Sequence, residues 1–165
     1  MRHKDIWTGH YRGIVYEVAK WQGGGGNDIW NYYIYIQMAN VPKEHLAQFD
    51  AAADLITHYP ALLERLEWHC GMTYVRRYVD HERNESCIQA GCDYNHLYDE
   101  GQVYSKEYLA HDARRTIDDL YEKAPWLLVW CRGCGSRTVP PEEAVFEDGQ
   151  YTCPRCRAKQ LVAKR

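Results

Sequence analysis

Four cysteines near the C-terminus restrict what this chain can fold into more than any other feature. They form two C-x-x-C pairs separated by eighteen residues: Cys131, Cys134, Cys153 and Cys156. Each pair can form a tight turn that directs two sulfur atoms at one point, and this spacing is typical of a four-thiolate zinc site. Because four protein ligands complete a tetrahedral shell, no position is left for a substrate, so we expect one structural Zn²⁺. Disulfides or redox-active C-x-x-C motifs are the alternatives, but the surrounding sequence does not indicate the βαβ unit in which redox motifs usually lie.

The segment that carries these cysteines, residues 126–165, is too short to bury a sufficient apolar core. Zinc binding of about 10–16 kcal/mol can supply the missing stability. We expect short strands beside the cysteine pairs, at residues 127–130, 149–152 and 160–163. In its cysteines and its order of strands, the segment resembles a zinc ribbon. Because Pro125 ends the preceding helix, we predict two domains, a main domain at residues 1–125 and a zinc ribbon at residues 126–165.

The rest of the composition indicates a globular protein inside a cell. The 165 residues suffice for one main domain with this small addition. No apolar run approaches the ~18 residues of a membrane-spanning helix, and residues 1–5 lack the apolar stretch of a signal peptide. We therefore expect a cytoplasmic protein without a membrane partner, in which Cys70, Cys87 and Cys92 are free thiols.

Charge is distributed unevenly along the chain. Residues 1–126 carry 13 Lys and Arg against 19 Asp and Glu, whereas residues 127–165 carry 7 against 4. Four thiolates on one Zn²⁺ bring the second segment close to neutral, so neither part is the strongly basic surface that usually drives nucleic-acid binding. A small basic cluster could still form, although a solvated face is the simpler interpretation; its members would be Arg155, Arg157, Lys159, Lys164 and Arg165. A nucleic-acid-binding zinc ribbon is therefore kept as an alternative.

The main domain is predicted to be α+β, with an antiparallel sheet and two main helices. Alternation of apolar and polar residues predicts strands at 14–18, 30–38, 68–79 and 86–93. Helical periodicity predicts main helices at 42–58 and 106–123, with a short helical segment at 61–66. Ser105 is the expected N-cap of the last helix. The four glycines from Gly23 to Gly26 form a hairpin loop rather than a phosphate loop, because a strand and not a helix follows them.

Two polar segments lie at the outer ends of the third and fourth predicted strands. If those strands form a hairpin, their ends meet, which brings His69 and Cys70 near the second segment. The second segment contributes Asp93, His96 and Asp99. These residue types could bind a metal or form a Cys–His–Asp constellation for a small hydrolase. In the structural alternative, the imidazoles bond to the backbone and Asp93 caps a turn.

The same two segments resemble a pattern found in small bacteriophage and prophage proteins, H-G-G-[LI]-T-Y followed by G-[FC]-D-x-x-H-x-x-D and a C-terminal helix. His69 to Tyr74 matches the first part, with Cys70 in place of the first glycine, and Gly91 to Asp99 matches the second. A strand around residues 11–13 and the aromatic strand at 32–36 fit the same layout. The resemblance spans about residues 10–123. It implies an accessory phage protein that works inside a bacterial host cell, without implying an activity.

Tyrosine and tryptophan are unusually frequent, with 14 Tyr and 6 Trp against 2 Phe. These side chains dominate the hot spots of protein interfaces. Tyr33 and Tyr35, on the polar face of the second predicted strand, are the partner-binding candidates. They could also stack on single-stranded bases, or they could replace phenylalanine in a half-exposed core.

Together these features favour a binding protein over an enzyme. We expect a phage-encoded accessory protein with a structural zinc that binds a bacterial host protein, for example an inhibitor of a defence system similar to an anti-CRISPR protein. A small hydrolase that uses His69, Asp93, His96 and Asp99 is the first alternative, and a zinc-ribbon nucleic-acid binder is the second.

Overall fold

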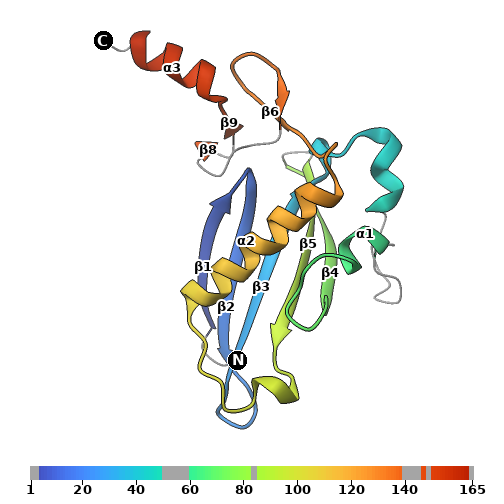
Figure 1. The fold of residues 1–165 in the computed structure, drawn as a ribbon, viewed down its shortest axis with the longest axis vertical. Helices are drawn as coiled ribbons and strands as arrows, with labels where there is room; N and C mark the ends of the chain where they lie inside the picture. The colour runs from blue at the N-terminus through green and yellow to red at the C-terminus, as the bar shows by residue number, and fades with distance from the viewer. Residues whose placement is uncertain (1–3, 50–59, 83–84, 139–145, 148–149, 164–165) are drawn as a thin grey trace.

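The computed structural model describes residues 4–49, 60–82, 85–138, 146–147 and 150–163. A five-stranded antiparallel sheet forms its centre, with the strands in the order β1-β2-β3-β5-β4. The strands are β1 (Lys4–Tyr11), β2 (Ile14–Gln22), β3 (Asp28–Gln37), β4 (Tyr74–Asp80) and β5 (Glu85–Tyr94). Helix α2 (Lys106–Lys123) lies across one face of this sheet (Figure 1). The predicted α+β class with an antiparallel sheet is confirmed.

The core between the sheet and α2 follows the alternation in the sequence. Strand β3 buries every second side chain, namely those of Trp30, Tyr32, Ile34 and Ile36. Helix α2 contributes one apolar stripe to the same core, made by Leu109, Ala113, Ile117 and Leu120. The bounds of α2 are those that the sequence predicted, and the Ser105 hydroxyl accepts a hydrogen bond from the backbone N–H of Tyr108 at 3.2 Å. Ser105 is therefore the N-cap.

The strand expected around residues 11–13 is wrong after Tyr11, because β1 covers Lys4–Tyr11 and residues 12 and 13 form a turn. Strand β1 pairs with β2 from Lys4 opposite Trp21 to Tyr11 opposite Ile14. Arg12 and Gly13, with φ of 47° and 83°, form the connection. A two-residue hairpin turn with positive φ at both positions matches the right-handed twist of the strands, so the Arg-Gly pair was the sequence signal for this hairpin.

The segment at 68–73 is irregular, although a strand was predicted from residue 68. Cys70 and Gly71 have φ of 55° and 100°, which a strand cannot accommodate. Strand β4 therefore starts only at Tyr74. It pairs with β5, so the ends of the third and fourth predicted strands do meet.

The remaining segments of the main body are short helices. They are η1 (Met38–Asn40), η2 (Lys43–Gln48), α1 (Ala61–Glu64) and η3 (Leu97–Asp99). A helix was predicted at 42–58, but its first part is the 3-10 helix η2. Residues 50–58 lie outside the described residues. None of the helices in the described ranges combines the length and the apolar character that crossing a bilayer requires.

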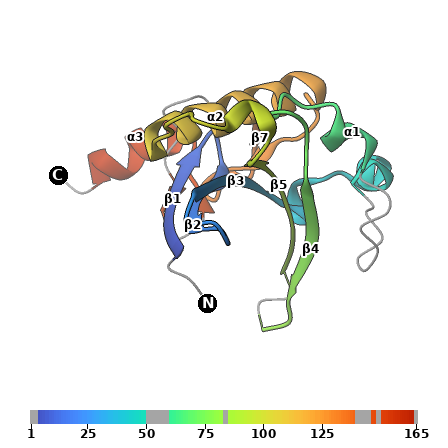
Figure 2. The ribbon, with the colours of Figure 1, turned by 90° about the horizontal axis from the view of Figure 1, so that it is seen from below.

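The sheet bends away from α2, so that seen end-on it forms an arch with α2 across its top (Figure 2). This curvature crowds the side chains on the inner side of the arch. Asn31 and Gln89 point to the face opposite α2, yet they are only 7 % and 8 % exposed. The inner face is thus partly closed by its own side chains.

The C-terminal segment forms a second, small apolar cluster, made by Val129, Cys131, Tyr151 and Cys153. Its elements are β6 (Val129–Trp130), β7 (Arg137–Thr138), β8 (Phe146–Glu147), β9 (Gln150–Tyr151) and α3 (Pro154–Ala163). The strand predicted at 160–163 is wrong, because these residues belong to α3. Proline suits a first helical turn, and Ala, Lys, Gln and Leu after it are good helix formers, which explains the helix. The division into domains at residues 125 and 126 stays a prediction.

Candidate metal centre and the histidine–aspartate cluster

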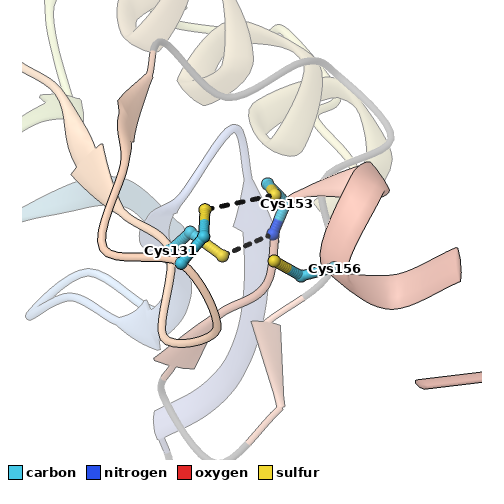
Figure 3. Close-up of side chains that lie close together, drawn as sticks. Cys131, Cys153 and Cys156 are labelled. Carbon is cyan, nitrogen blue, oxygen red and sulfur yellow. Dashed lines mark hydrogen bonds between the residues drawn. The ribbon is translucent and has the colours of Figure 1, made fainter. Parts of the chain in front are cut away.

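The four predicted metal ligands converge. The sulfur atoms of Cys131, Cys134, Cys153 and Cys156 all lie within 4.8 Å of one another. Tetrahedral coordination with metal–sulfur bonds of about 2.3 Å requires sulfur atoms about 3.8 Å apart. The sulfurs of Cys134 and Cys153 are 3.9 Å apart. Figure 3 shows Cys131, on the first turn, facing Cys153 and Cys156 at the start of α3. The four cysteines could therefore hold one metal ion.

The local backbone is built around this cluster. The N–H of Gly135 donates to the carbonyl of Cys131 at 2.9 Å, and Gly135 has φ of 69°, so the first cysteine pair forms a tight turn. A Cβ atom at Gly133 would lie 2.8 Å from the sulfur of Cys156. Only glycine lets the second pair approach this closely.

Backbone donors favour ionised sulfur at the centre. The N–H groups of Gly133 and Cys153 donate to the Cys131 sulfur at 3.3 and 3.2 Å. Burial alone raises the pKa of Cys131, but these N–H groups and that of Cys134 outweigh burial and lower it to about 6. The pKa of Cys156 is raised, first because its thiol is hydrogen-bonded to Cys153. A cation at the centre favours the thiolate form of all four residues.

The polar residues predicted to meet at the sheet edge do lie together. The His69 Nε2 atom is 2.7 Å from Asp99 Oδ1, and the His96 Nε2 atom is 3.2 Å from Asp93 Oδ1. The two imidazole centroids are 5.9 Å apart. Among the described residues, however, the only group with metal-ligand geometry is the cysteine cluster. Cys70, the fifth candidate, is exposed.

Asp99 is the centre of this histidine–aspartate cluster. Its side chain is only 5 % exposed. It accepts hydrogen bonds from the Tyr104 hydroxyl at 2.5 Å and from the His96 backbone N–H at 2.9 Å, in addition to the contact with His69. Burial raises the pKa of Asp99, but the donors Tyr104, His96 and His69 together lower it below its usual range. The Asp99 carboxylate thus connects residues 95–104 to the segment at 68–73 through hydrogen bonds.

His69 lies between stacked rings and a cavity. Its imidazole stacks on Tyr94 with centroids 3.8 Å apart. It lines a cavity of about 230 Å³ whose other walls include Cys70, Asp112 and Arg115. An imidazole oriented by a carboxylate can transfer protons. In the described part of the chain, however, no hydroxyl or thiol is hydrogen-bonded to the His69 ring, so a nucleophile in the arrangement of a triad is not assembled there.

Tyr33 and Tyr35 lie on the inner side of the arch and are half-buried. The Tyr35 hydroxyl donates to Glu17 at 3.2 Å and accepts from the Gln89 amide at 2.8 Å. Tyr33 packs edge-on against Tyr74, with ring centroids 5.4 Å apart, and burial raises its pKa to about 12. Both side chains therefore make contacts within the sheet. Their role in binding a partner stays a prediction.

The sequence did not lead us to predict a further candidate binding surface, which consists of exposed apolar side chains. In the segment 95–104, the side chains of Leu97, Tyr98 and Val103 are 87 %, 80 % and 97 % exposed. The sequence did contain a signal for this surface. These apolar residues lie in a polar loop without helical or strand periodicity, so no regular element would bury them.

Comparisons with known proteins found no match to this chain. No family model matches the chain, no curated protein matches it, and no solved structure matches it. Fold and site therefore define an α+β protein with a C-terminal four-cysteine centre.

Proposed function

We propose that this protein is an accessory protein of a bacteriophage or prophage that acts by binding a bacterial host protein. An inhibitor of a defence system, similar to an anti-CRISPR protein, is the most specific form of this proposal. The resemblance of residues 10–123 to small phage proteins supports the setting. The observation that carries the binding role is the exposed apolar segment at 95–104.

This segment has the properties of a preorganised binding loop. Exposed apolar side chains contribute binding energy only if a partner covers them, and a loop that is ordered beforehand loses little entropy on binding. The buried Asp99 orders the loop through bonds to His69, Tyr104 and the His96 backbone. Leu97, Tyr98 and Val103 are consequently presented to solvent on a fixed backbone.

We further propose that the ion at the cysteine centre is a structural Zn²⁺. Four cysteine sulfur atoms that lie within 4.8 Å of one another match the donor set of structural zinc sites, and they leave no open position for chemistry. Elemental analysis of the purified protein should give one zinc per chain. A content near zero, or iron in its place, would contradict this assignment.

Pull-down from bacterial lysate with quantitative mass spectrometry tests the binding role. We expect the wild-type chain to enrich one host protein, and the variant Leu97→Ser/Val103→Ser to lose it. Loss of a hot-spot side chain typically costs about 2 kcal/mol or more, which is a ~30-fold loss of affinity. The matched control is Leu161→Ser/Val162→Ser, since these side chains on α3 are also exposed, at 58 % and 71 %. If both variants lost the host protein equally, the binding would be nonspecific adhesion, and the loop at 95–104 would not be the binding site.

The hydrolase is the second candidate, favoured by the 2.7 Å contact between His69 and Asp99 beside a cavity. If it is correct, His69→Ala should abolish the biological effect while host-protein binding stays intact. For a pure binder, the two properties are lost together or not at all. Measuring both on the same variant decides between the two functions.

A further inference from the structure

The loop at 95–104 forms one wall of a depression at the end of the sheet. The other wall is the hairpin between β2 and β3, which lies at the same end of the sheet (Figure 1). The depression has a volume of about 920 Å³. Binding cavities typically measure about 300–1,000 Å³, so this one can take several residues of a partner chain.

Both walls are ordered before a partner binds. Lys20 on β2 pairs with Asp28 on β3 at 3.0 Å, which joins the two strands near the hairpin loop. In the other wall, the Asp99 carboxylate accepts a hydrogen bond from the Tyr104 hydroxyl. A site that is ordered beforehand loses less conformational entropy on binding.

The depression offers free side-chain amides. Asn27, from the hairpin, and Asn95 and Gln102, from the loop, line it and are exposed. Within the described part of the chain, these three amides make no side-chain hydrogen bond. A side-chain amide both donates and accepts, so a peptide group, which also does both, is a close complement to it.

The exposed apolar surface of the depression is mostly aliphatic. Leu97 and Val103 line it and are exposed, whereas the rings of Trp30 and Tyr94 in its lining are buried. Exposure of aliphatic side chains to water is unfavourable, so a partner that covers Leu97 and Val103 gains free energy. The apolar side chains of a polypeptide can provide this cover.

A nucleic acid is poorly suited to the same depression. Three carboxylates line it, those of Asp28, Asp99 and Glu100, and they would lie next to the phosphates. Apart from histidine, the only basic side chain among the described lining residues is Lys20, which already pairs with Asp28. The buried Trp30 offers little aromatic face on which a base could stack.

We propose that this depression binds an extended segment of the host protein, whose peptide groups bond to the amides of Asn27, Asn95 and Gln102. The inference rests on the proposed function and adds the form that the partner takes. The peptide groups along a helix are already paired within the helix, so a helical partner could not offer them. An extended segment keeps its N–H and C=O groups free, and its apolar side chains can cover Leu97 and Val103.

The test starts from the host protein that the pull-down identifies. Overlapping linear peptides that cover its sequence are titrated against the full, zinc-loaded chain, with fluorescence anisotropy as the readout. We expect one short stretch of the host sequence to bind. The variant Asn27→Leu/Gln102→Leu should weaken this binding roughly 30-fold, the loss expected for two hydrogen bonds. Methylation of alternate backbone nitrogens of the peptide removes donors without changing side chains and should also weaken binding.

The matched control is Gln37→Leu/Gln160→Leu. It replaces two exposed amides outside the depression, at the far end of β3 and on α3, and should bind the peptide like the wild type. Circular dichroism and zinc content establish that each variant is folded. If the depression pair is not folded, Gln102→Leu alone is measured, with an expected loss of about fivefold.

Failure of this inference differs from failure of the proposed function. If no host protein is captured through Leu97 and Val103, the proposed function is wrong and this inference with it. If a host protein is captured but no linear peptide binds, or the peptide becomes helical on binding, only the extended segment is wrong. Unchanged affinity in Asn27→Leu/Gln102→Leu, or an equal loss in the control, would also overturn it. A loss confined to the depression variant supports it.

Discussion

A single buried carboxylate, Asp99, holds the histidine–aspartate cluster together. It joins Tyr104 and the backbone of His96, which belong to its own loop, to His69, which lies thirty residues earlier in the chain. Sequence spacing could place His69 near Asp99, because the pairing of two strands brings their ends together. The contact with Tyr104 could not be predicted, because it depends on how the loop after β5 folds back.

Asp99→Asn should destabilise the fold at neutral pH by about 1–3 kcal/mol, since an amide cannot accept from all three donors. The folded-state pKa of Asp99 is lowered, so its stabilising effect is present above the unfolded pKa of about 3.9 and is lost as the pH falls below it. Urea denaturation of both proteins at pH 7 and at several values below 4 should therefore show the difference shrinking in acid. Asp93→Asn, at a more exposed carboxylate, serves as the control. A difference independent of pH would mean that the ionised form is not the stabilising one.

Cys70 holds a backbone conformation that normally requires glycine, with φ of 55°. The pattern that residues 69–74 resemble has glycine at this position, where this chain has a cysteine. A non-glycine residue in the left-handed region costs about 1–2 kcal/mol. We expect Cys70→Gly to be at least as stable as the wild type and Cys70→Val to be less stable by about 1 kcal/mol. Thermal denaturation compares the two, and equal stability of Gly and Val variants would exclude strain at this position.

At the scale of elements, periodicity predicted those that bury one regular face. Helix α2 and strand β3 are examples, because the apolar repeat of each is uninterrupted. Periodicity failed for α3, whose short apolar run Leu161–Val162 suits a strand equally well. It also failed for 68–73, where Cys70 and Gly71, both with positive φ, delay the start of the strand without a change in hydrophobic pattern. Local backbone conformation and metal anchoring are not encoded in periodicity.

The N-cap of α2 gives an element-scale prediction. Ser105→Ala removes the acceptor for the Tyr108 N–H and should destabilise the protein by about 1 kcal/mol. Ser105→Asp keeps an acceptor and adds a favourable charge at the helix N-terminus, so it should preserve stability. Denaturant titration measures both. Equal loss in the two variants would show that the hydroxyl acts by something other than capping.

At the scale of the whole molecule, two apolar clusters are separate. The larger one lies between the sheet and α2, and the smaller one surrounds the cysteines. The sequence predicted two domains through the cysteine spacing and the proline after α2, and that division stays a prediction. It could not predict that Trp126 belongs with the larger cluster, where its ring stacks on His45 with centroids 3.9 Å apart.

Removal of the metal should therefore unfold only the C-terminal part. With excess chelator, amide hydrogens of β3 and α2 should stay protected from exchange, while those of residues 129–138 and 150–163 lose protection. Cys153→Ser should give the same pattern without chelator. Hydrogen exchange read by mass spectrometry resolves the two regions. Loss of protection in all regions at once would show that the two clusters form one cooperative unit.

The junction between the clusters has a geometric consequence. Leu127 belongs to the larger cluster and Val129 to the smaller, so Leu128 alone separates them. Two residue steps span at most about 7 Å, which is too short for a swinging tether. The smaller cluster is therefore held close to the larger one. The protein would therefore present its two parts to a partner side by side, and not as two domains on a long flexible linker.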